Sequence, residues 1–152
     1  MISCYPAKPC HAPAVDKLAR QAGLSVDLEQ SLRSSHVHAW LAMRRERSSI
    51  LGFAVAQRLA DEFELVDIAT VPHERQQGVA SALLTRLLQV GDELGLVAMH
   101  LEVRSRNLAA LRLYEKFGFE LARTRRSYYR DPEDDALCLR RALAPGRDHP
   151  GK

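Results

Sequence analysis

The stretch Arg75-Gln76-Gln77-Gly78-Val79-Ala80 lies between an apolar run at 63–71 and a strongly amphipathic segment. The run before it predicts a buried strand. The residues after it place apolar side chains on one helical stripe, formed by Val79, Ala80, Leu83, Leu84, Leu87 and Leu88. A loop that contains glycine and opens directly into a helix gathers unpaired backbone N–H groups at the positive end of the helix dipole. The sequence therefore predicts an anion site here, and phosphate is the usual ligand.

The spacing around Gly78 differs from that of a Walker-type loop and from the dinucleotide glycine fingerprint. It resembles instead the R/Q-x-x-G-x-G/A element with which the GCN5-related N-acetyltransferases hold the pyrophosphate of acetyl-coenzyme A. An ordinary glycine-containing turn between a strand and a helix would give the same short pattern. The rest of the chain is needed to choose between these two interpretations.

Further segments follow in the order and at the intervals typical of this family. A strand at 97–103 leads into Arg104-Ser105-Arg106-Asn107, and a short helix then ends at Gly118 after placing four residues on one face, Ala110, Leu111, Tyr114 and Phe117. The hairpin residues Arg125-Arg126-Ser127-Tyr128-Tyr129 and Asp134-Asp135-Ala136 resemble those of protein N-terminal acetyltransferases. The resemblance covers residues 53–143 and is strongest to the RimI-type ribosomal-protein alanine N-acetyltransferases.

This resemblance implies an α/β (α+β) fold with a mixed, mostly antiparallel central sheet. The sheet would have six to seven strands, about four flanking helices, and a splay at its two central strands. Hydropathy periods and turn residues agree with this fold. They predict additional strands at 2–5, 38–43, 50–59, 121–129 and 136–143, a helix that ends at Gly23, and a second helix capped by Asp27. We expect one domain over residues 1–143 and a frayed tail over 144–152.

Composition limits the class of protein. The chain has 152 residues and a net charge of +3, which permits an acidic or ribosomal partner without requiring one. No apolar stretch is long enough to span a membrane, and the N-terminus lacks a signal pattern. Cys4, Cys10 and Cys138 form an odd, unpatterned set, so we expect no disulfide framework and no zinc site. These features predict a cytoplasmic protein without a metal.

By the family resemblance, acetyl-coenzyme A is the co-substrate. Its pyrophosphate would be held by the loop residues Gln76, Gln77, Gly78, Val79, Ala80 and Ser81. The pantetheine arm would lie along the backbone of Ile68, Ala69 and Thr70, with one N–H group serving the oxyanion. Asn107 matches a family position that contacts the cofactor, although it could equally be a helix N-cap.

Glu102 is the candidate base and Tyr114 the candidate acid. Alternation along the strand places Glu102 with His100 on one face, and a carboxylate there is costly unless it is paired or used. Its alternative role is an ion pair with an arginine such as Arg104 or Arg125. Tyr114 could instead be only a core aromatic, since its helical spacing explains burial equally well.

The acceptor substrate is the part of the predicted function that the sequence defines least. The resemblance assigns Tyr128 and Tyr129 to the acceptor peptide, whereas without it they would be ordinary edge-strand aromatics. The aromatic-Pro-Trp-Ser element of RimI-type enzymes is missing from 24–29, and the single tryptophan is Trp40. A ribosomal-protein N-terminal alanine is the first choice, helped by acidic residues Glu62, Glu64, Asp67 and Glu102. Another peptide or small amine is the alternative, as is a nonenzymatic ribosome- or RNA-associated module, although we expect no direct nucleic-acid contact.

Overall fold

A computed structural model describes residues 1–45 and 49–143 of the chain. The expected tail at 144–152 lies outside the described residues. The chain divides into two compact units: unit 1 comprises Met1–Ala60 and Leu65–Val90, and unit 2 comprises Asp61–Glu64 and Gly91–Lys152. We describe each unit by itself.

The strands form a seven-stranded sheet in the order β1-β2-β3-β4-β5-β7-β6. The strands are β1 (Ile2–Pro6), β2 (Val37–Arg44), β3 (Ile50–Leu59), β4 (Glu62–Thr70), β5 (Ala98–Arg104), β6 (Glu120–Arg130) and β7 (Glu133–Ala142). Four α-helices accompany them among the described residues: α1 (Ala12–Gln21), α2 (Leu28–Ser31), α3 (Val79–Glu93) and α4 (Leu108–Lys116). Two short 3-10 helices, η1 (Pro9–His11) and η2 (Pro72–Glu74), complete the order. The predicted mixed α/β fold is confirmed.

Antiparallel ladders join β1 to β2, β2 to β3, β5 to β7 and β6 to β7. The exception is the parallel ladder between β4 and β5, which joins residues 62–64 to residues 98–100. Its three residue pairs all lie within unit 2. The splay expected at the two central strands stays a prediction.

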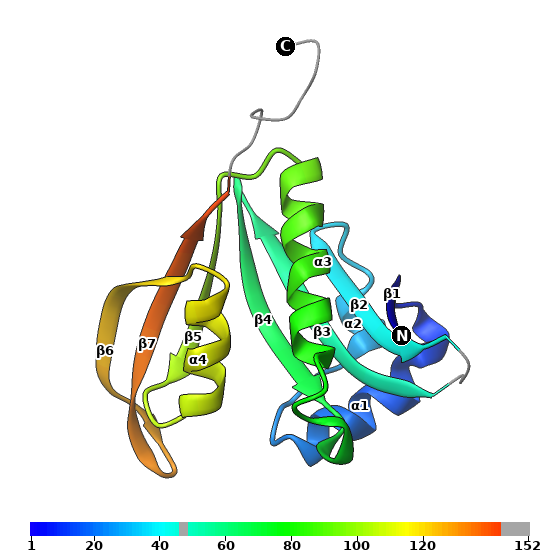
Figure 1. Cartoon of the computed structure of the whole chain (residues 1–152), viewed down its shortest axis with the longest axis horizontal. Helices are drawn as coiled ribbons and strands as arrows, with labels where there is room; N and C mark the ends of the chain where they lie inside the picture. Colours follow the sequence, from blue (N-terminus) through cyan, green and yellow to red (C-terminus); the bar gives the residue numbers. More distant parts are fainter. Residues whose placement is uncertain (46–48, 144–152) are drawn as a thin grey trace. The chain divides into compact units, whose positions relative to one another are not determined.

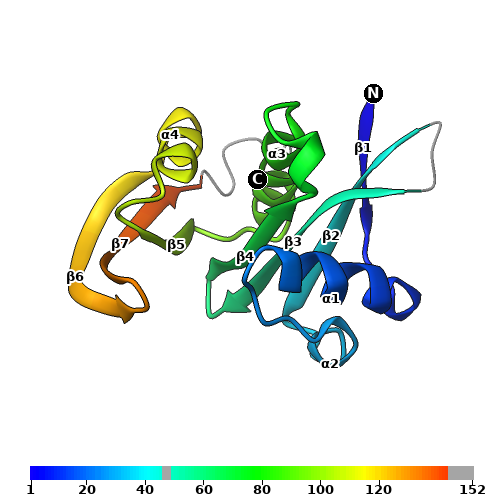
Figure 2. The ribbon, with the colours of Figure 1, turned by 90° about the horizontal axis from the view of Figure 1, so that it is seen from below.

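In unit 1, helices cover both faces of the sheet (Figure 2): α1 and α2 lie on one side and α3 on the other. The core under α1 and α2 includes Val15, Leu28 and Phe53, each at most 1% exposed. On α3 the predicted apolar stripe is confirmed, since Leu83, Leu84 and Leu87 are fully buried. Burying one such side chain contributes about 1.5–3 kcal/mol, so the stripe fixes the helix firmly on the sheet.

In unit 2, the alternation of β5 is confirmed. Its buried side chains are Met99, Leu101 and Val103, while His100, Glu102 and Arg104 project from the opposite face. Helix α4 lies over β5 and β7 in both ribbon views (Figure 1). Gly118, with φ of 84°, follows the helix, and Phe119 donates to the carbonyl of Tyr114 at 3.0 Å. This left-handed glycine ends α4 as the sequence predicted.

Candidate active site

The predicted anion loop of unit 1 has the backbone of an anion nest. Gln76 and Gly78 have positive φ angles of 63° and 85°, and such conformations turn successive N–H groups toward one concavity. None of the backbone N–H groups from 76 to 81 donates to another described residue. The loop opens the 15-residue helix α3, whose dipole adds positive potential. A Cβ atom at Gly78 would meet nothing within 4 Å, so the space before the loop is open.

Arg44 holds this loop in place, a role that the sequence analysis did not assign. Its guanidinium pairs with the Glu74 carboxylate and donates to Gln77 Oε1 at 2.9 Å. The Arg44 side chain is 27% exposed and that of Glu74 only 13%, so the pair is partly shielded from water. Arg44 is the last residue of β2. Its partners lie 30 and 33 residues away, so only the folded chain could reveal them.

Gly52 is a second residue that the sequence analysis missed. A Cβ atom at this position would lie 2.6 Å from the Ala69 carbonyl oxygen and 2.8 Å from a Val79 methyl group. Only glycine therefore allows β3, β4 and the first turn of α3 to approach this closely. Ala69 is buried, and its neighbours Ile68 and Thr70 are half-buried. Gly52 thus sets the position of the two segments assigned to the cofactor within unit 1.

Glu102 projects from the open face of β5 in unit 2. Its side chain is 33% exposed, and its Oε1 atom lies 3.6 Å from Arg125 Nη2. A carboxylate on this strand is expected to be paired or used, and the contact with Arg125 meets the first of these conditions. The alternative of an ion pair with Arg125 is confirmed as a contact. It leaves the carboxylate accessible, so it does not exclude a chemical role.

Tyr114 is buried, with 5% of its surface exposed, and packs edge-on against Phe119 at 5.6 Å between ring centroids. Its hydroxyl makes no hydrogen bond to the described residues. Burial raises the pKa of Tyr114 to about 12. The phenol is therefore protonated over the whole working pH range, and it is available as a hydrogen-bond donor.

Asn107 is the N-cap of α4, since its Oδ1 atom accepts from the Ala110 N–H group at 3.2 Å. The capping role left open by the sequence is thus confirmed. A contact with the cofactor through its amide nitrogen stays a prediction.

Tyr128 and Tyr129 lie at the end of β6, which is the edge strand of the sheet. Their rings pack edge-to-face at 5.2 Å, and the guanidinium groups of Arg125 and Arg104 lie 5.4 and 4.1 Å from the centroids of Tyr128 and Tyr129, respectively. Tyr128 is 50% exposed. Burial, followed by the charge of Glu102, raises the pKa of Tyr129. The two tyrosines and the proposed base therefore share one neighbourhood in unit 2.

Asp134 connects this hairpin to the loop after β5. It is 8% exposed, and its carboxylate accepts from the Ser105 hydroxyl, from Arg106 N at 3.1 Å and from Asp135 N at 2.8 Å. These bonds, led by that of Ser105, lower the pKa of Asp134. The hairpin motif had drawn attention to Asp134 by resemblance only. The structure gives it a physical role, which is to fix the loop that leads into α4.

The acidic residues are less available than the sequence suggested. Glu62 lies 3.5 Å from Arg140, and Glu102 is paired with Arg125. Burial raises the pKa of Asp67, which favours its neutral form. Arginine partners that lie far along the chain thus reduce the negative charge that was expected near the acceptor amine.

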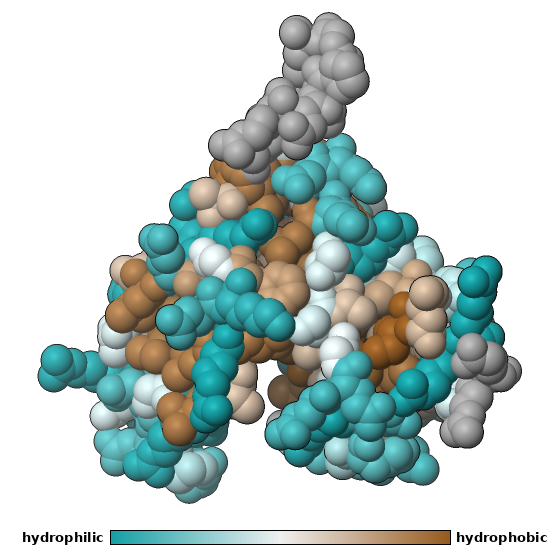
Figure 3. Space-filling view, viewed as in Figure 1, coloured by the Kyte–Doolittle hydropathy of each residue, from teal (hydrophilic) through white to brown (hydrophobic). Residues whose placement is uncertain are grey.

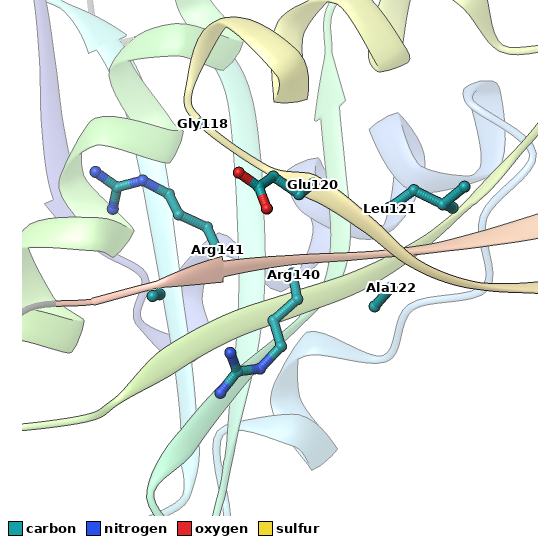
Figure 4. A pocket seen from close by; sticks show the side chains of 7 residues that line it. Gly118, Glu120, Leu121, Ala122, Arg140 and Arg141 are labelled. Atoms are coloured by element: carbon teal, nitrogen blue, oxygen red, sulfur yellow. The ribbon is translucent and has the colours of Figure 1, made fainter.

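Each unit carries a surface pocket. One in unit 2, of about 390 Å³, is lined by Gly118, Glu120, Arg140 and Arg141 among others (Figure 4). In Figure 4 the two arginine side chains leave β7 on opposite sides. Another in unit 1, of about 610 Å³, is lined by α1 residues such as Lys17 and by Val71, Pro72 and His73. Neither pocket is lined by Glu102 or Tyr114, so pocket volume alone does not identify the candidate catalytic residues.

The surface around α4 carries apolar and hydrophilic side chains side by side (Figure 3), and exposed Leu108 and Leu121 belong to unit 2. The described residues contain no group of three or more His, Cys, Asp or Glu that could hold a metal ion. All three cysteines are free thiols. No helix among the described residues is long and apolar enough to cross a membrane.

The nest at the start of α3, the mixed sheet and the β5–α4 arrangement together define an acyltransferase-type fold, and the comparison with known families agrees. The sequence profile described as "Acetyltransferase (GNAT) family" matches residues 7–119. The chain belongs to this acetyltransferase family.

Among curated proteins, the chain is 38% identical over 96 residues to the [ribosomal protein bS18]-alanine N-acetyltransferase of Escherichia coli K12. This match spans 62% of the chain and 65% of that relative's length. The Salmonella typhimurium protein of the same name is 42% identical over 89 residues, which are 57% of the chain and 60% of the relative.

Solved structures show the same fold. The ribosomal-protein-S18-alanine N-acetyltransferase from Escherichia coli superposes with a TM-score of 0.85 at 26% identity, covering 98% of this chain and 99% of that one. Arabidopsis thaliana NAA60 in complex with acetyl-CoA superposes with a TM-score of 0.83 at 17% identity, covering 94% and 99%. The latter likeness concerns the fold alone.

Proposed function

We propose that the protein is an acetyl-coenzyme A-dependent N-terminal acetyltransferase whose acceptor is the N-terminal alanine of a ribosomal protein. The observation that carries this proposal is the run of unpaired N–H groups from 76 to 81 at the start of α3. The names of the similar bacterial proteins support the acceptor. The free thiols support a cytoplasmic location.

The loop fits a pyrophosphate group. Donors from Gln76 to Ser81 would bind its oxygens, and Gly78 leaves room for the ligand because no atom lies within 4 Å of the place its Cβ would take. Backbone groups of Ile68, Ala69 and Thr70 would align the pantetheine arm, and the Asn107 amide would add a contact. Bound acetyl-coenzyme A would supply the acetyl thioester, and the protein would need to orient it, stabilise the oxyanion and handle two protons.

Glu102 would accept the first proton. A peptide α-amine titrates near 7.7–8.0, so at neutral pH the base removes a loosely held proton, directly or through water. The exposed position of Glu102 on the open face supports this role, because an acceptor could approach it from solvent. The amine, once neutral, attacks the thioester carbonyl.

Tyr114 would assist the leaving thiolate. With a pKa of about 12 its hydroxyl is a weaker acid than a free thiol, which titrates near 8.5, so a complete transfer from tyrosine is uphill. Its function is therefore a hydrogen bond to the sulfur that strengthens as negative charge develops. The absence of any other partner for this hydroxyl among the described residues supports the assignment.

The acceptor is tested by incubating the protein with acetyl-coenzyme A and a mixture of peptides with different first residues, followed by mass spectrometry. We expect acetylation of α-amines of peptides that begin with alanine or serine. Modification chiefly of internal lysine side chains would contradict the assignment.

A small amine is the alternative acceptor, and one observation favours it. The segment between α1 and α2 lacks the Pro-Trp element, α2 has only four residues, and the single tryptophan, Trp40, lies on β2 with Arg86 4.6 Å from its ring centroid. Thiol release with polyamines but with no N-terminal peptide would select this alternative.

A further inference from the structure

The open face of unit 2 places a cation next to the proposed base. Arg125 on β6 reaches Glu102 on β5, although β7 lies between these strands. Neighbouring strands are about 4.8 Å apart, so the Arg125 side chain must extend across the width of β7. Its register partner on β7 is Ala136, which is small and fully buried. Cys138, the register partner of Glu102 on β7, also bonds to the Arg125 side chain, so its thiol lies between the two charged groups.

The contact does not saturate the guanidinium. The Nη2–Oε1 distance of 3.6 Å exceeds the roughly 2.7–2.9 Å of a charge-assisted hydrogen bond. The Arg125 Nε atom is buried and has no partner among the described residues. The guanidinium is also held near the ring of Tyr128. Charge, the Tyr128 ring and Cys138 thus keep Arg125 beside Glu102. The Arg125 side chain is still 41% exposed, so part of its guanidinium can reach a third group.

We propose that Arg125 binds the first carbonyl oxygen of the acceptor peptide while Glu102 receives its α-amine. In an amino-terminal residue, the amine nitrogen and this oxygen are about 3 Å apart by covalent geometry. That separation matches the distance between the two charged groups on this face. The guanidinium is a planar array of donors and the carboxylate an acceptor, so together they complement an amine beside a carbonyl.

This pairing deepens the proposed function and rests on it. A lysine side chain or a simple polyamine presents an amine without a neighbouring carbonyl, so it would engage Glu102 alone. Arg125 would thereby select α-amines of peptides over other amines. The residue acts on specificity, and the proton transfer itself stays with Glu102.

The experiment compares two acceptors: a hexapeptide that begins with alanine, and the same peptide with a trans alkene in place of its first amide bond. The wild type should prefer the natural peptide by about 10- to 100-fold in kcat/KM, the effect of one hydrogen bond from a charged donor. In Arg125→Ala this preference should fall to about threefold or less, because the natural peptide loses more than the analogue. Arg125→Gln provides the same test if the alanine variant does not fold.

Arg123→Ala is the matched control, since Arg123 is exposed on the same strand and forms no ion pair among the described residues. It should keep the wild-type preference. An unchanged preference in both Arg125 variants, or a wild type that does not discriminate, would overturn the role of Arg125 alone. A wild type that releases no thiol with any N-terminal peptide would instead contradict the proposed function, and this inference with it.

Discussion

Gly52 on β3 lies so close to Ala69 on β4 that a Cβ atom at Gly52 would be 2.6 Å from the Ala69 carbonyl oxygen. Gly52→Ala should therefore destabilise unit 1 by about 1–3 kcal/mol, the usual cost of overpacking. It should also weaken acetyl-coenzyme A binding, because Val79 at the start of α3 must move away from the sheet. Urea denaturation and calorimetric titration measure both effects. Gly91→Ala is the control, since there the nearest atom is the end of the flexible Leu143 side chain; equal losses in the two variants would contradict the argument.

Charge at Gly78 should oppose the pyrophosphate. Gly78→Asp and Gly78→Asn share the strain of a side chain at φ of 85°, and they differ mainly in charge. We expect the Asp variant to bind acetyl-coenzyme A about 10- to 100-fold more weakly than the Asn variant, because unscreened like charges near 4 Å repel by a few kcal/mol. Calorimetry on both variants checks this. Equal affinities would remove the loop from the cofactor site.

Glu102→Gln should lower turnover most at neutral pH. The loss should shrink as pH rises above about 8, because the α-amine then loses its proton without a base. A pH profile of kcat for the variant and the wild type measures the effect, and Glu115→Gln on the exposed side of α4 serves as the control. The same loss at every pH would indicate that Glu102 positions the peptide.

Tyr114→Phe keeps the ring against Phe119 and removes only the hydroxyl. Turnover should fall by about 10²- to 10³-fold, as when one hydrogen-bond donor to a developing negative charge is removed, with little change in cofactor affinity. The Tm should be nearly unchanged, since the hydroxyl has no hydrogen bond to lose among the described residues. A reduction of only two- or threefold would return Tyr114 to a purely structural role in the core.

Asp134 should make the free energy of unfolding decrease as the pH falls into the acid range. Its folded pKa lies below the ordinary value of 3.8, mainly because of the Ser105 hydroxyl. The stabilisation is therefore present above pH 3.8 and is lost as pH falls through the folded pKa. Asp134→Asn should be less stable than the wild type near pH 7, and the difference should narrow below pH 3.8. Denaturation curves at several pH values test this, with exposed Asp131→Asn as the control; a constant difference would show that packing and not charge is responsible.

The sequence by itself determined the features that depend on local periodicity and turn chemistry. The apolar stripe of α3, the alternation of β5, the Asp27 and Asn107 caps and the glycine stop of α4 follow from neighbours within one or two helical turns. Gly78 of the anion loop belongs to the same class, because its positive φ depends only on the backbone conformation of that turn.

Tertiary structure alone decided which distant side chains meet. The sequence named Arg125 as one of two possible partners of Glu102, and the ladder order across β5, β7 and β6 selected it. The hold of Arg44 on Glu74 and the close approach of Gly52 to Ala69 had no local signal, since each depends on strand pairing between segments far apart in the chain. Long-range pairing is set by the burial of whole faces of the sheet, and that information is spread over the chain and absent from any single motif.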